Sequence, residues 1–196
     1  ENGTLPQYEL AQEGIKQAHL AGDKFKKELE DANIPFERVR ICYSPFARTA
    51  HTARVVASVL GLPFEGDQCK VVDDLHERYF GPSYELESHD RYPEIWALDE
   101  KNPFECPEGG ESAADVVSRL ARAIQLMEDS FEGCAILVVS HGDPLQLLQT
   151  VLNAAKEQEA SNCFDFASRI EAVKVPSILS KHRKFGLDTG ELRAVA

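Results

Sequence analysis

The sequence predicts an α/β protein built as a three-layer sandwich, in which helices cover both faces of a parallel sheet. Two apolar segments, 39–43 and 134–139, are each followed by a turn and then by a segment with helical periodicity. The second apolar segment is unbroken, which is typical of a strand buried on both faces of a parallel sheet. Strands that alternate with helices in this way indicate the α/β class.

Length, composition and charge narrow the function classes. A chain of 196 residues fits a single domain spanning 1–196, and 43% hydrophobic with 28% charged residues argues against disorder. The formal net charge of −12 disfavours nucleic acid and anionic membranes as partners, since both need a cationic face. No apolar run approaches the roughly 20 residues that span a bilayer.

The N-terminal third is predicted to form a helix, a strand and a second helix. Apolar residues recur at helical spacing from about residue 10 to residue 29, and partial alternation predicts the strand at 39–43. The second helix is expected over about 49–60, where Gly61 and Pro63 end it.

The segment 63–107 has a different composition. It holds five of the ten prolines and seven of the sixteen aromatic residues, so it cannot be one long helix or strand. One interpretation is a long loop pinned by its own aromatic side chains. The other is a lid-like insertion that forms a pocket wall.

Capping signals mark the third helix. Gly109 and Gly110 precede Ser112, which is a plausible N-cap, and Asp115 follows three residues later, close to a capping box. The apolar stripe of this helix is predicted to be core.

The strand at 134–139 leads into a further helix. That helix is expected over about 145–155, with Asp143 as its cap and Pro144 at its first position.

The C-terminal quarter is less regular. Residues 154–165 are polar and predict a loop, and a strand candidate lies around Val173 and Val175. The short basic run 181–184 is interpreted as a solvated surface stretch.

Cysteines and histidines indicate neither a disulfide framework nor a metal site. The five cysteines are odd in number, widely spaced and without a C-x-x-C pair, so we expect reduced thiols and a cytoplasmic protein. The six histidines show no metal-ligand spacing, and no nucleotide-binding glycine motif occurs. No cofactor is therefore predicted.

Arg48 and His141 occupy equivalent places, each after a strand and just before a helix. Ligands of open α/β sheets bind at the carboxyl ends of strands, where helix N-termini favour anions. The two side chains together therefore predict a phosphate pocket, with the planar guanidinium as the main donor. The alternatives are a surface ion pair for Arg48 and a plain strand-ending polar residue for His141.

Glu77 lies among aromatic residues of the segment 63–107. A carboxyl group partly buried there could hold a raised pKa and donate a proton. The alternative is a glutamate that is solvated or paired with Arg78.

Five segments, in order along the chain, resemble the histidine phosphatase superfamily, the phosphoglycerate mutase-like proteins. They are L-A-Q-E-G-I-K-Q-A at 10–18, S-P-F-A-R-T-A-H-T-A at 44–53, L-H-E-R-Y-F-G at 75–81, G-G-E-S at 109–112 and V-V-S-H-G at 138–142. The chain is also similar to plant members of this family.

The resemblance implies a fold, a mechanism and roles for three residues. A nucleophilic histidine of an R-H-G segment would form a phosphohistidine, while Arg48 binds the phosphoryl oxygens. His141 would stabilise charge on the transferring group, and Glu77 would protonate the leaving oxygen. No metal is required, because arginine and histidine supply the positive charge. The implied partner is a small phosphorylated substrate or phosphate.

The sequence R-H-G does not occur in this chain. In the family it precedes the helix that begins here near Leu10, so we expect it, and the first central strand that carries it, upstream of Glu1. The complete protein would then be a phosphatase, while this chain alone would lack its nucleophile and be inactive. The alternative is a catalytically inactive relative that binds an anion or phospho-ligand, or a truncated product.

Comparison within the family favours hydrolysis over phosphoryl transfer between substrates. The mutases carry a tyrosine just before the glycine of the L-x-E-R segment, where this chain has Phe80, and a paired arginine farther on, whereas no Arg-Arg pair occurs here. The resemblance therefore implies a phosphomonoesterase rather than a glycolytic mutase.

Overall fold

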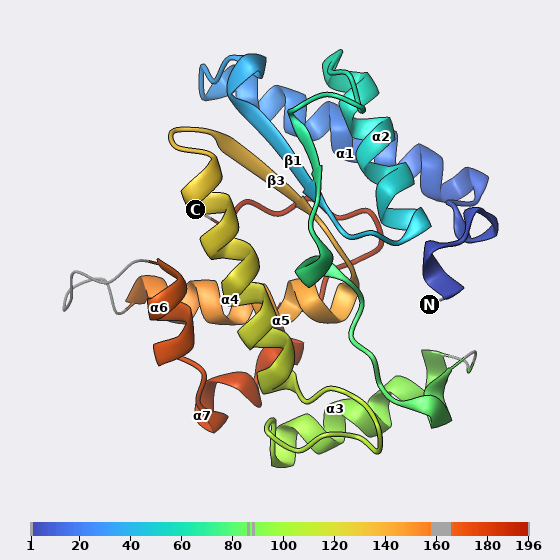
Figure 1. Ribbon diagram of the computed structural model, residues 1–196, viewed down its shortest axis with the longest axis vertical. Coiled ribbons are helices and arrows are strands. Elements are labelled where there is room, and N and C mark those ends of the chain that lie inside the picture. Colours follow the sequence, from blue (N-terminus) through green and yellow to red (C-terminus); the bar gives the residue numbers. More distant parts are fainter. Residues whose placement is uncertain (1, 86, 88, 158–165, 196) are drawn as a thin grey trace.

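The computed structural model describes residues 2–85, 87, 89–157 and 166–195 as an α/β fold (Figure 1). Its helices and strands, in chain order, are α1 (Gln12–Asp31), β1 (Val39–Tyr43), α2 (Ala47–Leu60), β2 (Cys69–Val71), α3 (Tyr92–Lys101), α4 (Ala113–Ser130), β3 (Ala135–Val139), α5 (Gly142–Glu157), α6 (Phe166–Ala172) and α7 (Pro176–Leu179). Two short 3₁₀ helices also matter here, η4 (Asp73–Leu75) and η7 (His182–Phe185). Within these described ranges, no helix is long and apolar enough to cross a membrane.

The sheet is parallel and has the order β2-β1-β3. β1 is the central strand of the three: Ile41 pairs with Cys69 on one side and with Leu137 on the other. The carboxyl ends of all three strands therefore meet at one edge, and α3 lies beyond that edge (Figure 1). The predicted parallel sheet is confirmed.

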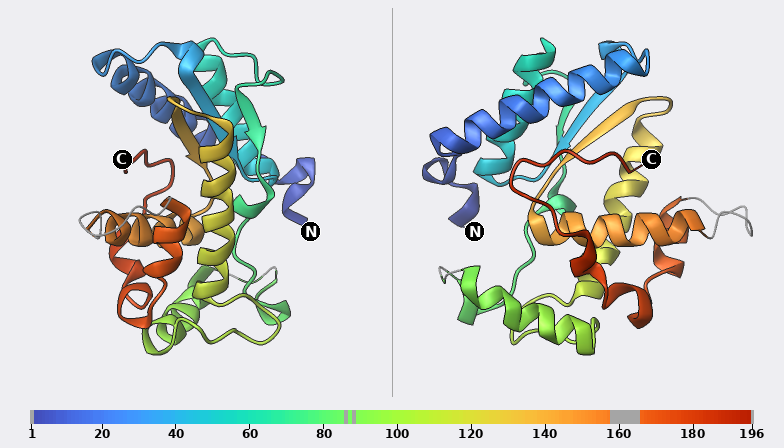
Figure 2. Two further views of the ribbon diagram at one scale, coloured as in Figure 1. Left: turned by 60° about the vertical axis from the view of Figure 1, so that its left-hand side comes forward. Right: turned by 180° about the vertical axis from the view of Figure 1, so that it is seen from behind.

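Two layers of helices cover the sheet, as the sandwich prediction requires (Figures 1 and 2). Alternate residues of a strand point to opposite faces. Val39 and Ile41 pack with α1 and α2, whereas Cys42 packs with α4 and α5. In β3, Leu137 joins the first cluster and Val138 the second. Each face of the sheet thus has its own apolar core.

Local signals set the helix ends that position the site. The Ser112 hydroxyl accepts a hydrogen bond from the Asp115 N–H over 3.0 Å, and the Asp115 carboxylate accepts from the Ser112 N–H over 2.9 Å. This is the predicted capping box of α4. Gly61 ends α2 with a left-handed φ of 70°, a conformation that glycine adopts at little cost.

The prediction that the strand at 134–139 is buried on both faces is wrong. β3 lies at the edge of the described sheet, and four of its five residues are only partly buried. Its side chains still join the apolar clusters on both faces, and a cavity lies against Leu137, Val138 and Val139. The unbroken apolar run therefore predicted the strand correctly but did not predict how deeply its side chains are buried.

The prediction of a strand around Val173 and Val175 is also wrong, because this segment links α6 to α7. The Val173 N–H donates to the Arg169 carbonyl over 3.2 Å and so continues the turn of α6. Pro176 then opens α7, where a proline is well tolerated. The buried Ile170 and Val173 are three residues apart, which is helical rather than extended spacing.

The helix after β3 is longer than predicted. It begins at Gly142, so Asp143 lies in its first turn and is not its cap. It continues to Glu157, inside the predicted loop 154–165, whose residues 158–165 lie outside the described part of the chain.

Segment 63–107 contains two regular elements that the sequence did not predict. β2 has three residues, too few for a periodicity to show. α3 carries Pro93 in its first turn, a position where proline does not disturb a helix. The proline count therefore excluded a long element but not these short ones.

Candidate active site

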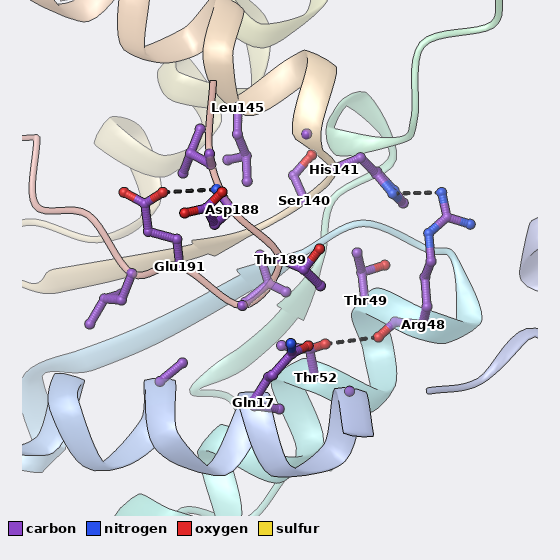
Figure 3. A pocket seen from close by; sticks show the side chains of 18 of the residues that line it. Gln17, Arg48, Thr49, Thr52, Ser140, His141, Leu145, Asp188, Thr189 and Glu191 are labelled. Atoms are coloured by element: carbon purple, nitrogen blue, oxygen red, sulfur yellow. Dashed lines mark hydrogen bonds between the residues drawn. The ribbon is translucent and has the colours of Figure 1, made fainter. Parts of the chain in front are cut away.

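A cavity of about 730 Å³ opens at the carboxyl edge of the sheet. Its walls come from α1, the first half of α2, the end of β3 and the C-terminal segment 187–192 (Figure 3). Arg48, Glu77 and His141 all line it. The structure thus brings together the three residues that the sequence singled out, although they lie in three separate segments.

Arg48 reaches the centre of this cluster from the first turn of α2. Its Nη2 lies 2.8 Å from His141 Nδ1 (Figure 3). The same Nη2 lies 3.4 Å from Glu77 Oε2. Because 40% of its side chain stays exposed, the guanidinium can also meet a ligand that enters the cavity. The ion pair that the alternative expected exists, with Glu77 at 3.4 Å, but it lies in the wall of the cavity and is joined by His141.

His141 follows the end of β3 and is buried, with 4% of its surface exposed. A guanidinium only donates hydrogen bonds, so Nδ1 accepts from Arg48 and the ring proton sits on Nε2. Nε2 then donates to the hydroxyl oxygen of Ser44, 2.8 Å away at the end of β1. Burial, reinforced by the charge of Arg48, lowers the pKa of His141 well below its usual value. The imidazole is therefore neutral.

Glu77 closes the cluster from the segment after η4. Its Oε2 lies 3.6 Å from His141 Nδ1, and its Oε1 accepts from the Arg78 N–H over 3.1 Å. Burial, with the nearby charge of Asp143, raises the pKa of Glu77 to about 7, although Arg48 opposes the shift. A carboxyl group of this pKa can hold and release a proton near neutral pH. The alternatives of a solvated side chain or an Arg78 side-chain pair are wrong.

Arg78, whose backbone N–H binds Glu77, is the centre of a buried ionic network. The fully buried Arg78 guanidinium donates to both oxygens of Asp99, over 2.7 and 2.9 Å, and to Asp143 over 3.2 Å. His182 Nε2 donates to the same Asp99 over 3.0 Å. Burial acts to raise the pKa of Asp99, but the hydrogen bonds from His182 and Arg78 prevail and hold it below its usual range. α3, α5 and the C-terminal segment are thereby fixed around the cavity.

The prediction that 181–184 is a solvated surface run is wrong for His182, which is buried against Asp99. Lys181, Arg183 and Lys184 are exposed as predicted, although the Arg183 guanidinium lies 3.5 Å above the centre of the Trp96 ring. Sequence reasoning missed both contacts because the partners are more than 80 positions away. Ser44, which contacts His141, was not predicted as a site residue. Its position directly after β1, at the carboxyl end of a strand, is the feature that could have identified it.

An α/β sheet with an arginine, a buried histidine and a carboxyl group of raised pKa at its carboxyl edge defines a class of proteins that act on small anions. A family model described as histidine phosphatase superfamily (branch 1) matches residues 3–172. The chain belongs to this superfamily, and the resemblance inferred from its five segments is confirmed.

Two curated relatives carry names that describe their activity or organisation. A metal-independent phosphoserine phosphatase of Arabidopsis thaliana is 28% identical over 146 residues, which are 71% of this chain and 56% of that protein. The bifunctional protein Rv2228c of Mycobacterium tuberculosis is 35% identical over 108 residues, which are 54% of this chain and 28% of that protein. The chain therefore spans between about a quarter and a little over half of the length of these relatives.

Solved structures share the fold. A mycobacterial glucosyl-3-phosphoglycerate phosphatase in complex with inorganic phosphate superimposes with a TM-score of 0.58, at 21% identity, over 83% of this chain and 73% of its own. Bacillus stearothermophilus YhfR gives a TM-score of 0.57 at 27% identity, over 75% and 69% of the two chains. These likenesses confirm the predicted fold class.

Proposed function

We propose that this chain provides the phosphoryl-binding and acid-catalytic part of a metal-independent phosphatase that hydrolyses small phosphomonoesters. The observation that carries the proposal is the meeting of Arg48, His141 and Glu77 at one point of the cavity, within 3.6 Å of one another. Arg48 binds phosphoryl oxygens through its fork of N–H donors. The free thiols of Cys42, Cys69, Cys106 and Cys134 fit a reducing, cytoplasmic setting.

The proposed reaction has two balanced steps. A histidine nitrogen attacks phosphorus, the bond from phosphorus to the leaving oxygen breaks, and protonated Glu77 gives its proton to that oxygen. Water then attacks the phosphohistidine, the P–N bond breaks, and the Glu77 carboxylate takes the proton from the water. Arg48 stabilises the negative charge that builds on the phosphoryl oxygens in both transition states, and His141, whose Nδ1 accepts from Arg48, holds that guanidinium in place.

The nucleophile of the first step is not His141. Both of its ring nitrogens are engaged, Nδ1 with Arg48 and Nε2 with Ser44. The resemblance assigns the attack to the histidine of an R-H-G segment, a sequence that residues 1–196 do not contain. A second candidate function is a relative that binds a phospho-ligand at Arg48 and His141 without turnover.

Turnover separates the two candidates. We expect a form of the protein that carries the R-H-G histidine to release phosphate from p-nitrophenyl phosphate and phosphoserine in the presence of EDTA, and to form an acid-labile phosphoenzyme. Phosphate that raises the melting temperature while no substrate is hydrolysed would instead assign the binding role. Neither hydrolysis nor phosphate-dependent stabilisation would overturn both candidates.

A further inference from the structure

Phe46 contacts both members of the Arg48–His141 pair without lining the cavity. The Arg48 guanidinium lies over its ring, with Cζ 5.0 Å from the ring centre. The centre of the His141 ring lies 4.9 Å from the same point, and the two ring planes meet edge to face at 69°. One aromatic ring therefore touches the two side chains whose 2.8 Å hydrogen bond forms the centre of the site (Figure 3).

The backbone of Phe46 is fixed beside this pair. Phe46 is the N-cap of α2, and its carbonyl accepts a hydrogen bond from the Thr49 hydroxyl over 2.8 Å. Its N–H donates to the Ser44 hydroxyl oxygen over 3.4 Å, and that oxygen also accepts from His141 Nε2. The ring of Phe46 therefore projects from a backbone that is held on both sides.

The N-terminal segment limits where the ring can move. Gly3 packs against it so closely that a Cβ at this position would lie 2.5 Å from two of the ring carbons, closer than such atoms approach in proteins. Phe46 is thus partly buried, with Gly3, Arg48 and His141 as neighbours.

Arg48 needs such a support. An arginine side chain has many rotamers, and 40% of this one is exposed, so fixing it in one orientation costs entropy. Its hydrogen bonds to His141 and Glu77 both leave from Nη2 and hold only one corner of the guanidinium. The face of an aromatic ring attracts a guanidinium and restrains its plane, which hydrogen bonds at a single nitrogen do not.

From these contacts we propose that Phe46 is a positioning residue, which holds the Arg48 guanidinium in the orientation that binds His141 and meets a phosphoryl group. The inference rests on the proposed function and adds to it a residue that touches neither the substrate nor the reacting atoms. Phe46→Leu keeps an apolar side chain but removes the ring, whereas Phe46→Tyr keeps the ring. Phe46→Met, which is unbranched, replaces Phe46→Leu if that variant does not fold.

Binding of inorganic phosphate measures this role. We expect Phe46→Leu to raise the calorimetric Kd of phosphate by about 3- to 10-fold and Phe46→Tyr by no more than about twofold. Phe64→Leu is the matched control. Phe64 also stacks on an arginine of α2, Arg54 at 5.1 Å, and on a second ring, that of Tyr43 at 5.2 Å, but it lies outside the cavity wall. It should change the Kd by less than about twofold.

The pKa of His141, followed by NMR, separates positioning from burial. The charged or titratable groups that face His141 are Arg48 of α2, Arg119 of α4, and His76 and Glu77 of the segment after η4. Burial and the charge of Arg48 lower the pKa. If Phe46 acts through Arg48, Phe46→Leu should raise the pKa of His141, yet leave it nearly unchanged when Arg48→Met is already present.

Two results would overturn the proposal. One is an equal rise of the His141 pKa with and without Arg48→Met, because the ring would then only bury His141. The other is an equal effect of Phe46→Leu and Phe64→Leu on phosphate binding, which would leave the proposed function intact. If the unaltered protein does not bind phosphate, the proposed function fails instead. The NMR comparison needs no ligand, so it still tests the role of Phe46.

Discussion

Arg48 and His141 are 93 residues apart and meet at 2.8 Å, each placed by the end of a neighbouring strand of the sheet. The pair joins a permanent cation to an imidazole through a hydrogen bond that only the neutral ring can accept. The register that pairs Tyr43 with Val139 brings the two strand ends level. The register of the strands and the turns that follow them therefore place Arg48 where its guanidinium keeps the His141 ring neutral.

His141 should resist protonation, and Arg48 should be one reason. Burial and the Arg48 charge both lower its pKa, so we expect ¹⁵N NMR to show the neutral Nε2–H form below pH 6.5, the ordinary histidine pKa. Arg48→Met should raise the pKa of His141. Because the folded pKa lies below the unfolded one, stability from this residue is present above about pH 6.5 and is lost as the pH falls. A ring that titrates normally in the unaltered protein would contradict the geometry.

Removing either partner should reduce turnover. Arg48→Ala deletes the charge that stabilises the transferring phosphoryl group, and His141→Ala deletes the acceptor that holds this guanidinium in place, so we expect kcat to fall by about 10²- to 10³-fold in each variant. Arg54→Ala, on the same helix but stacked on Phe64 and bonded to Glu9, should change kcat by less than about twofold. Steady-state assays with p-nitrophenyl phosphate measure both effects. Unchanged turnover in both site variants would count against the assignment.

Glu77 should matter most when the leaving group is poor. Glu77→Gln removes the proton donor, so kcat for an alkyl phosphate such as phosphoserine should fall by about 10²- to 10⁴-fold. The loss should be much smaller for p-nitrophenyl phosphate, whose leaving oxygen needs little protonation. In the unaltered protein, activity toward phosphoserine should decline above about pH 7, the pKa of this carboxyl group. Equal losses on both substrates would assign Glu77 a structural role instead.

Glu77 should also make the free energy of unfolding depend on pH, with a sign opposite to that expected for His141. The pKa of Glu77 rises from 4.5 to about 7 on folding, so its contribution is fully present below pH 4.5 and is lost as the pH rises through 7. Glu77→Gln should therefore unfold at higher urea concentration than the unaltered protein at pH 8.5. The difference should shrink toward pH 5.

Two of the three strands and the three central site residues could be predicted from the sequence, because both are encoded locally. An apolar run, a turn and a helix start can be recognised within a dozen residues, and Arg48 and His141 sit inside such units. The long-range contacts of the C-terminal segment could not be predicted in this way. Arg183 is an exposed cation, as the sequence predicts, but its stacking on the Trp96 ring 87 positions away has no local signal. The position of β3 at the edge of the described sheet could not be predicted either, because β3 has the apolar composition of a central strand.

The Arg78 network explains why distant segments hold their places. Arg78 binds Asp99 of α3, Asp143 of α5 and the Glu111 carbonyl before α4, with its side chain fully buried. Arg78→Met removes the cation and leaves two carboxylates unpaired in the interior. We expect the free energy of unfolding to fall by about 3–5 kcal/mol, measured by urea denaturation.

A second arginine provides the comparison for this network. Arg122→Met breaks the pair with Asp74, in which 64% of the arginine side chain is exposed, and should cost no more than about 1 kcal/mol. If both variants lost the same free energy of unfolding, burial would not be the source of the Arg78 effect.

Asp99→Asn should also lower the free energy of unfolding, because it removes a charge that both Arg78 and His182 contact.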